Sequence, residues 1–501
     1  MIEPHRPHLR LPLLLCLLLF ASFPTRADEA VVVGYHNTPD RSGRYVMPGL
    51  TAERARGIHL DAGFNGDIAG HVYAQPIYWR PAGATKGVLI VATEDDTVYA
   101  LDADSGATLW RTELGKPVPR SSLRCGNINP LGITGTPAID ARRETAYFDA
   151  MVAVQDRPQH LIFALALRDG SIRQGWPLNV TDALARQGLR FNARDQNERG
   201  AVTIAGDRLF VPFGGHWGDC GDYHGWVVGV ALDHPEDIIA WTTRAQGGGI
   251  WAPGGIVTDG RSLFIATGNT MSAKVWSDGE AAFRLGLDLK RFERPSDYFA
   301  PSDWQALDDA DLDLGGSNPM LLDVPSGGET RPLLLALGKD GKAYLLDRNN
   351  LGGIGGALAV ETVSTESIRT APAAFRSGNA VMVAFQGRGA ACPSAARGPG
   401  LTVLKIVAEP KPEITTLWCG SLRGAGSAIA TVSDANGADP IVWITGAEGD
   451  NRLHGFKGET GEELSASGAA GMAGLRHFGT ILAVNNRLYV AADGRVYAFA
   501  F

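Results

Sequence analysis

Short runs of apolar residues, separated by polar turns that contain glycine, recur along the whole chain. The clearest unit predicts four strands, at residues 71–79, 87–93, 98–102 and 108–111. Between the last two strands lies Asp104-Ser105-Gly106, a turn in which aspartate accepts backbone hydrogen bonds and glycine tolerates a left-handed conformation. Four short strands joined by tight turns indicate an antiparallel sheet.

Weaker copies of this unit follow roughly every 45–60 residues, which is the signature of a repeat architecture. They span residues 133–176, 200–241, 249–298, 318–363, 370–418 and 427–464. A last unit within 478–499 supplies only three strands, and residues 57–61 near the N-terminus can supply the fourth. We therefore expect an all-β fold, a β-propeller of about eight four-stranded blades. Seven blades are the alternative, and the N-terminal strand closes the ring so that no sheet edge stays open.

Composition agrees with this fold and narrows the function classes. The 501 residues include 63 glycines and 28 prolines, which suits many short strands and turns. A chain of this length is too long to fold around one compact core of ordinary size, unless repeats divide the core among small units. The formal net charge is −8 and no run of Lys or Arg is present, which argues against nucleic acid as a partner.

The first residues predict a targeting segment. A basic start is followed by an apolar stretch at 11–23, too short to span a bilayer, and by a small-residue cleavage site at 25–27. No later stretch is apolar and long enough for a membrane helix, so we expect an exported, periplasmic protein without a membrane span in the mature chain. The expected organisation is a signal peptide at 1–27, an N-terminal extension at 28–56 and a propeller domain at 57–501.

One signature connects the first unit to a known family. Residues 100–110 read Ala-Leu-Asp-Ala-Asp-Ser-Gly-Ala-Thr-Leu-Trp and match the A-x-D-x-x-T/S-G-x-x-x-W pattern of quinoprotein propeller blades. In this pattern alanine allows close packing of blades, glycine makes the turn, and Trp110 docks between neighbouring blades. The chain thus resembles the PQQ-like (quinoprotein alcohol dehydrogenase-like) β-propeller family, where PQQ is pyrroloquinoline quinone, and in particular its exported PQQ-repeat proteins.

The stretch around Trp251 resembles the cofactor-binding blade of this family. Three glycines at 247–249 precede Trp251, and Asn269 follows the next predicted strand. In the family the tryptophan lies under the PQQ ring and the asparagine binds calcium. The resemblance therefore implies that Trp251, Gly248 and Gly249 contact PQQ and that Asn269 is a calcium ligand.

Two further segments carry the rest of the resemblance. Lys339 begins the sequence Lys-Asp-Gly-Lys-Ala-Tyr-Leu-Leu-Asp-Arg, which follows the family pattern K/R-x-G-x-x-Y-x-L-D-R, and its first basic residue contacts the quinone. The segment Tyr-Phe-Ala-Pro-Ser-Asp-Trp, ending at Trp304, resembles the run before the family's catalytic aspartate. This implies a general base at Asp313 or Asp311, with Asp303 as a weaker candidate. Four arginines precede predicted first strands and are candidates to pair with PQQ carboxylates: Arg199, Arg369, Arg423 and Arg476.

The departures from the family pattern are also informative. The adjacent Cys-Cys pair is absent, and the loop 216–224 lacks the family's calcium-binding glutamate, for which Asp219 or Asp222 is the candidate replacement. No C-x-x-C-H haem motif occurs, so an electron acceptor would be external. Glu94-Asp95-Asp96 in the first unit is interpreted as a turn rather than a calcium site. One further set has the spacing of a transition-metal site, which a disulfide would remove: His216, Cys220, Asp222 and His224.

Four cysteines follow the targeting segment: Cys125, Cys220, Cys392 and Cys419. An even number in an oxidising compartment suggests two disulfides, for which three pairings exist. In a propeller, the links between blades and the loops between second and third strands emerge on one face. All four cysteines fall in such segments, and we expect the pairs Cys125–Cys220 and Cys392–Cys419. The same face receives the residues singled out above: 247–251, Asn269, Asp311, Asp313 and Lys339.

Two functions are compatible with these patterns. The first is a periplasmic dehydrogenase that oxidises an alcohol, sugar or aldehyde with PQQ and calcium and passes electrons to an external acceptor. The second is a cofactor-free propeller that binds an envelope protein as an assembly scaffold. In the second case Trp251 only packs between blades, Asn269 is a turn residue, Lys339 belongs to a strand–turn signature, and Asp311 and Asp313 lie in a solvated acidic loop.

Overall fold

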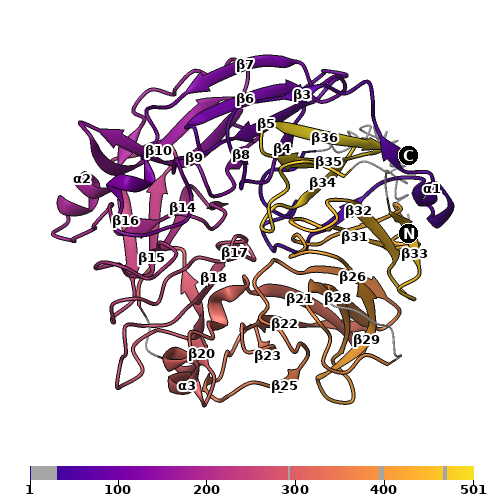
Figure 1. Cartoon of the computed structure of the whole chain (residues 1–501). Helices are drawn as coiled ribbons and strands as arrows, with labels where there is room; N and C mark the ends of the chain where they lie inside the picture. The colour runs from indigo at the N-terminus through magenta and orange to yellow at the C-terminus, as the bar shows by residue number, and fades with distance from the viewer. Residues whose placement is uncertain (2–30, 292–293, 394–399, 467–470) are drawn as a thin grey trace.

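The computed structural model describes the chain except for residues 2–30, 292–293, 394–399 and 467–470. The predicted signal peptide therefore lies almost entirely outside the described residues. In the described part, the strands form eight mainly antiparallel sheets that stand around a ring (Figure 1). The predicted propeller is confirmed with eight blades, and the alternative count of seven is wrong. No helix among the described residues is long and apolar enough to cross a membrane.

The blades follow the chain in order. Blade 1 contains β4 (Ile77–Trp79), β5 (Val88–Ala92), β6 (Thr97–Asp102) and β7 (Thr108–Glu113). Blade 2 contains β8 (Ala138–Asp140), β9 (Thr145–Val154), β10 (Arg157–Ala166) and β11 (Leu178–Asn179). Blade 3 contains β13 (Thr203–Ala205), β14 (Arg208–Gly215), β15 (Trp226–Ala231) and β16 (Ile238–Thr242), with β12 (Gln196–Asn197) paired to β14. Blade 4 contains β17 (Val257–Thr258), β18 (Ser262–Thr267), β19 (Ala281–Gly286) and β20 (Tyr298–Ala300), extended by β24 (Gly353–Ile354).

The second half of the ring repeats the same order. Blade 5 contains β21 (Met320–Ser326), β22 (Glu329–Leu337), β23 (Lys342–Asp347) and β25 (Ala359–Thr362). Blade 6 contains β26 (Ala373–Ser377), β27 (Ala380–Gln386), β28 (Gly400–Val407) and β29 (Glu413–Ser421). Blade 7 contains β30 (Ala430–Ser433), β31 (Ile441–Thr445), β32 (Leu453–Lys457) and β33 (Glu463–Ala466). The α-helices are α1 (Ala52–Arg56), α2 (Val180–Ala185) and α3 (Trp304–Asp309), and the 3₁₀ helices are η1 (Arg120–Ser122), η2 (Pro295–Asp297) and η3 (Leu314–Gly316).

The N-terminal part of the chain closes the ring, as predicted. Blade 8 contains β34 (Ile481–Val484), β35 (Arg487–Ala492) and β36 (Arg495–Ala500), and its outer strand is β2 (His59–Leu60). His59 lies opposite Ala500 and Leu60 opposite Phe499, in antiparallel register. The short strand β3 (Gly66–Asp67) pairs with the other end of β36. Joining the two ends of a chain in one sheet removes the open edge that a propeller would otherwise have.

Packing between blades uses the residue types of the sequence signature. The indole Nε1 of Trp110 donates a hydrogen bond of 3.1 Å to the carbonyl of Leu167 in the neighbouring blade. Trp418 makes the same kind of contact, with 2.7 Å to the carbonyl of Gly458. Buried apolar side chains fill the spaces between sheets; Leu89 of blade 1, for example, shares a cluster with Tyr489 of blade 8. The tryptophans therefore dock between blades, as the pattern predicts.

The segment 31–47, which we call the hub segment, lies inside the ring (Figure 1). It contains β1 (Arg44–Val46), which pairs in parallel with β30, the innermost strand of blade 7. Val32 exchanges hydrogen bonds with Tyr78 of β4. Further bonds reach Ile139, Thr258 and Ala374, in blades 2, 4 and 6. The region was predicted only as an N-terminal extension, but its backbone groups form hydrogen bonds with the inner strands of most blades.

Candidate functional site

The turn at residues 247–249 passes between two neighbouring loops. Gly247 and Gly248 have φ angles of 88° and 63°, which side-chain-bearing residues rarely adopt. The Gly247 N–H donates to Tyr223 O at 2.9 Å, and the Gly248 N–H donates to Asn269 O at 2.7 Å. A Cβ at Gly247 would lie 2.8 Å from Asn269 O, so the position has no room for one. The glycines thus allow the turn before Trp251 to lie directly against the backbone at Asn269.

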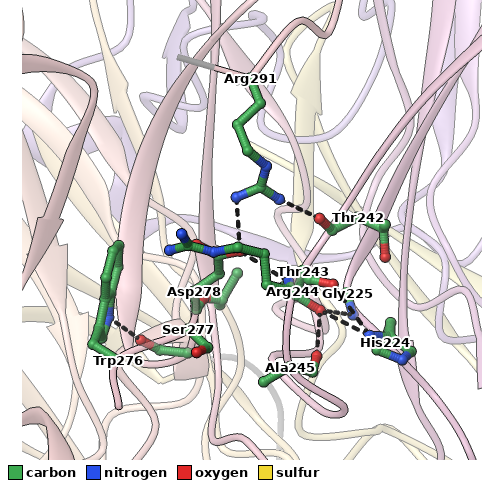
Figure 2. A network of polar contacts seen from close by, with 12 residues as sticks. His224, Gly225, Thr242, Thr243, Arg244, Ala245, Trp276, Ser277, Asp278 and Arg291 are labelled. Atoms are coloured by element: carbon green, nitrogen blue, oxygen red, sulfur yellow. Dashed lines mark hydrogen bonds and ion pairs between the residues drawn. The ribbon is translucent and has the colours of Figure 1, made fainter. Parts of the chain in front are cut away.

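A polar network contacts this turn through Thr243 (Figure 2). The buried carboxylate of Asp278 pairs with two guanidinium groups, Arg244 at 2.8 Å and Arg291 at 2.7 Å. The hydroxyl of Thr243 accepts from the Gly225 N–H at 3.1 Å and lies 3.0 Å from the Gly247 carbonyl. Charge-assisted bonds to a buried carboxylate hold both loops in one geometry. The network therefore ties the segment before the turn to the loop between β18 and β19.

A cavity of about 490 Å³ opens on the face that collects these loops, a volume within the range of small-molecule sites. Most residues predicted for a cofactor site line it: Trp251, Gly249, Asn269, Asp219, Asp311, Asp313, Lys339 and Arg369. Gly248 and Asp222 do not line the cavity, and Asp222 is exposed. The tertiary structure thus brings together segments of blades 3 to 6 that the sequence could only assign to a common face.

Asp313 lies at the centre of this arrangement. Its Oδ2 accepts from the Trp251 indole at 3.0 Å and lies 2.5 Å from the Lys339 ammonium. Its Oδ1 accepts from the backbone N–H of Asn269 at 2.8 Å. Asp311 is 64% exposed and reaches the same ammonium at 2.8 Å. Of the two predicted bases, Asp313 is the one held in a single position by neighbouring donors.

Two cations flank the indole of Trp251. The Lys339 Nζ lies 5.2 Å from the ring centre, and the Arg199 Cζ lies 5.3 Å from it. Such distances are typical of cation–π contacts. Burial lowers the pKa of Arg199, and its Nε has no hydrogen-bond partner among the described residues. Arg369 adds a third cation at the cavity wall, where it is exposed. The other two predicted arginines, Arg423 and Arg476, do not line the cavity.

Several residues at the cavity were missed by sequence reasoning. The Tyr223 hydroxyl donates to Asp219 at 2.7 Å, and burial raises the pKa of this aspartate. Glu280 is buried behind Asp313 and accepts from the Leu314 N–H at 2.6 Å. Burial, and then the charge of Asp313, hold the pKa of Glu280 well above its usual value. In the sequence, only position could have indicated these two residues. Tyr223 lies within the loop 216–224, and Glu280 lies in the same loop as Asn269, between β18 and β19. Four further aromatic rings line the cavity: His216, Trp217, His477 and Phe478.

The residues present fit a quinone better than they fit calcium. A planar tricarboxylate such as PQQ needs an aromatic face and cations, and Trp251, Arg199 and Lys339 offer both. A calcium ion needs six to eight oxygens. Both oxygens of Asp313 are already engaged by donors, and in the described part of the chain no three acidic, histidine or cysteine side chains are placed to hold a metal. The carboxamide of Asn269 does line the cavity, but no ready calcium site is formed around it.

Both predicted disulfides are present. Cys125 and Cys220 are bonded with their Cα atoms 6.0 Å apart, and Cys392 and Cys419 with theirs 5.8 Å apart. A Cβ on Gly218, which lines the cavity, would lie 3.6 Å from the sulfur of Cys125. The first disulfide therefore supports the cavity wall. It also removes the Cys220 thiolate from the transition-metal alternative, and both bonds agree with export to an oxidising compartment.

Comparison with solved structures identifies the fold. The quinohemoprotein alcohol dehydrogenases from Comamonas testosteroni and Pseudomonas putida HK5 match with TM-scores of 0.62 and 0.64, at 15% and 14% sequence identity. The chain has the eight-bladed fold of the quinoprotein alcohol dehydrogenases. These matches cover 95% and 94% of this chain and 81% and 80% of those chains.

The comparisons show the fold and leave the activity open. BamB from Moraxella catarrhalis matches with a lower TM-score of 0.48 at 16% identity, over 83% of this chain and 94% of that chain. No family model matches the sequence. No curated protein matches it either. Identities of this size establish a common architecture, whereas function resides in the side chains of the site.

Proposed function

We propose that this chain is an exported, periplasmic quinoprotein-type dehydrogenase that binds PQQ in the cavity beside Trp251. Its substrate would be an alcohol, a sugar or an aldehyde, and its electrons would pass to an external acceptor. The observation that carries the proposal is the position of Asp313. Its carboxylate lies in a cavity between an aromatic indole and a lysine ammonium, where a base is needed beside a flat, electron-accepting ring.

Each residue has a definite task in this proposal. Trp251 provides the face on which a planar ring stacks, and Arg199, Lys339 and Arg369 provide positive charge for carboxylates and ring oxygens. PQQ, when bound, supplies a quinone that takes up two electrons as hydride. Asp313 accepts the hydroxyl proton of the substrate at Oδ1, whose donor is the Asn269 N–H, and Lys339 holds the carboxylate in place through Oδ2.

The proposed reaction does not require calcium, and titration with Ca²⁺ tests whether the ion binds at the cavity. Asn269 and Asp219 are at the cavity, and the assignment of metal ligands to Asn269, Asp219 and Asp222 stays a prediction. The ammonium of Lys339 lies 2.5 Å from Asp313 and already supplies a positive charge at this carboxylate. No step above depends on a divalent ion.

The test is a titration of the purified mature protein with PQQ, with and without Ca²⁺. We expect a rise in Tm, quenching of tryptophan fluorescence and dye-linked activity with at least one substrate class. Lys339→Met should lose activity and weaken PQQ binding. Lys342→Met is the matched control, because Lys342 pairs with Asp303 and Asp340 and does not line the cavity. A protein that shows no thermal or spectral response to PQQ would contradict the proposal.

One observation favours the alternative of a cofactor-free scaffold. The charged groups at the centre of the cavity are already paired, since Lys339 contacts both Asp311 and Asp313. These groups therefore have partners without a ligand. Recovery of a stable envelope partner by affinity capture, together with no response to PQQ, would support the scaffold.

A further inference from the structure

A second group of buried carboxyls lies between blades 1, 2 and 3, outside the cavity. Glu94 and Asp96 come from the turn between β5 and β6, Asp149 comes from β9, and Glu198 precedes β13. All four are at most 3% exposed. Ionisable groups of this kind are buried at a large cost unless they are paired. The group is not used by the proposed dehydrogenase chemistry.

The link between blades 1 and 2 holds these carboxyls in place. The Gly132 N–H donates to Glu94 Oε2 at 2.7 Å, and the Gly135 N–H donates to Glu198 Oε2 at 3.0 Å. A Cβ at Gly132 would lie 2.6 Å from Asp96 Oδ1, and a Cβ at Gly135 would lie 1.9 Å from Glu198 Oε1. The two glycines thus leave space that carboxylate oxygens occupy.

The oxygens of this group are mostly without partners. Asp96 is decisive, because it is 0% exposed and neither of its oxygens accepts a hydrogen bond from any described residue. Six buried oxygens in and beside this group have no hydrogen-bond partner among the described residues: Glu94 Oε1, Asp96 Oδ1 and Oδ2, Thr134 Oγ1, Asp149 Oδ1 and Glu198 Oε1. Native proteins rarely leave buried polar atoms unsatisfied, so each such atom calls for a ligand or an explanation.

Protein groups offset only part of the negative charge. The His160 Nδ1 lies 2.6 Å from Asp149 Oδ2, and its Nε2 lies 3.2 Å from the carbonyl of Gln196. Both ring nitrogens therefore face acceptors, and His160 is the hydrogen-bond partner of one carboxylate of the group. Glu94, Asp96 and Glu198 have no cationic side chain in direct contact among the described residues.

We propose that Glu94, Asp96, Asp149 and Glu198, with the Thr134 hydroxyl, bind one hard divalent cation, Ca²⁺, that ties blades 1, 2 and 3 together. The ligand chemistry is that of calcium, which takes six to eight carboxylate and hydroxyl oxygens in adaptable geometry. No three of these acidic side chains are already gathered around one point. Binding therefore includes rotation of the carboxyls toward the ion, and the unpartnered oxygens can turn without breaking a hydrogen bond to a described residue.

The competing state is a cluster that simply holds protons. Burial, together with the charges of Glu94 and Asp149, raises the pKa of Asp96 to about 9. In that state replacement of Asp96 by asparagine would be harmless and calcium would have no effect. The two states can therefore be separated by calcium alone, without PQQ.

The experiment uses the mature protein stripped with EDTA and then given Ca²⁺ alone. We expect one calcium per chain by elemental analysis after dialysis, and a calcium-dependent rise in Tm. Asp96→Asn should abolish both the bound calcium and the rise in Tm. Glu198→Gln, which serves as the test if the Asp96 variant does not fold, should weaken calcium binding at least tenfold. Asp95→Asn is the matched control, since it removes the same charge from the same turn while Asp95 is not in the buried group.

The cavity must be excluded as the source of the signal. Asn269→Ala, at the cavity, should keep the calcium-dependent rise in Tm. Absence of bound calcium at millimolar concentration, a response that survives Asp96→Asn, or one that is lost in Asn269→Ala would each overturn the proposal. Because PQQ is absent throughout, the result does not depend on the dehydrogenase proposal.

Discussion

The indole Nε1 of Trp251 and the Oδ2 of Asp313 are 3.0 Å apart, and this bond joins blade 4 to the loop before blade 5. The ring that would carry a quinone is thereby fixed relative to the carboxylate that would act as base. Trp251→Phe retains an aromatic face but removes the donor. We expect this variant to bind PQQ within a few-fold of the parent and to lose about tenfold or more in kcat, since a bond to a charged group contributes about 1.5–3 kcal/mol.

The kinetic and binding readouts for Trp251→Phe separate two roles. If Trp251 only packs between blades, kcat and PQQ affinity would change little while Tm falls. Trp241→Phe, at a buried tryptophan outside the cavity, is the control for general loss of packing.

Breaking the pair of Lys339 and Asp313 should destabilise the fold. The two side chains are 12% and 3% exposed, so Lys339→Met leaves a buried carboxylate without its cation. We expect a loss of about 3–5 kcal/mol in the free energy of unfolding by urea denaturation. The double variant Lys339→Met/Asp313→Asn should recover a large part of this loss. Equal losses in the single and double variants would show that the pair is not coupled.

The turn before Trp251 should not tolerate a side chain. Gly247→Ala combines a φ of 88° with a contact of 2.8 Å to Asn269 O. Gly260 has a φ of 84° with nothing within 4 Å, so Gly260→Ala measures the conformational cost alone, about 1–2 kcal/mol. We expect Gly247→Ala to lower Tm more than Gly260→Ala and also to weaken PQQ binding. Similar effects of the two substitutions would mean that the close approach is unimportant.

The two disulfides should differ in their effect on the cavity. Replacing either pair by serine should cost about 2–5 kcal/mol of stability. Because Cys125–Cys220 lies against Gly218 of the cavity wall, its removal should also reduce PQQ affinity. Removal of Cys392–Cys419, outside the cavity lining, should lower Tm without changing that affinity. Isothermal titration and thermal unfolding of both variants check this difference.

Acid should destabilise the hub. Burial lowers the pKa of His36 to about 3, so the folded state keeps its imidazole neutral, while the unfolded chain takes up a proton near pH 6.5. Stability is therefore fully present above about pH 6.5 and falls as the pH decreases toward 3. His36→Asn should reduce the loss of unfolding free energy between pH 7 and pH 4 by up to about 3 kcal/mol. His234→Asn, at an exposed histidine, should leave the pH profile unchanged.

Much of the architecture was predictable because each blade is a local structure. Four strands, their turns and the docking tryptophan Trp110 lie within a short stretch of chain, so the pattern of residues in that stretch is sufficient. The ring closure by residues 57–61 followed from the missing fourth strand of the last unit. Both cysteine pairs followed from the rule that equivalent loops emerge on one face. The same rule placed Trp251, Asn269, Asp313 and Lys339 together.

Other features exist only through contacts between distant segments. The hub segment carries no sequence repeat, and its hydrogen bonds depend on the free inner edges of blades that form elsewhere. Glu94 and Asp96 do form the predicted turn. Asp149 and Glu198 come from blades 2 and 3, and they lie near this turn only because the blades are neighbours in the ring. Glu280 lies behind Asp313 because the loop before β19 packs against η3. Local residue patterns were enough to predict the repeated sheets and the face that bears the site. They could not predict which buried charges meet, because burial and pairing are properties of the assembled ring.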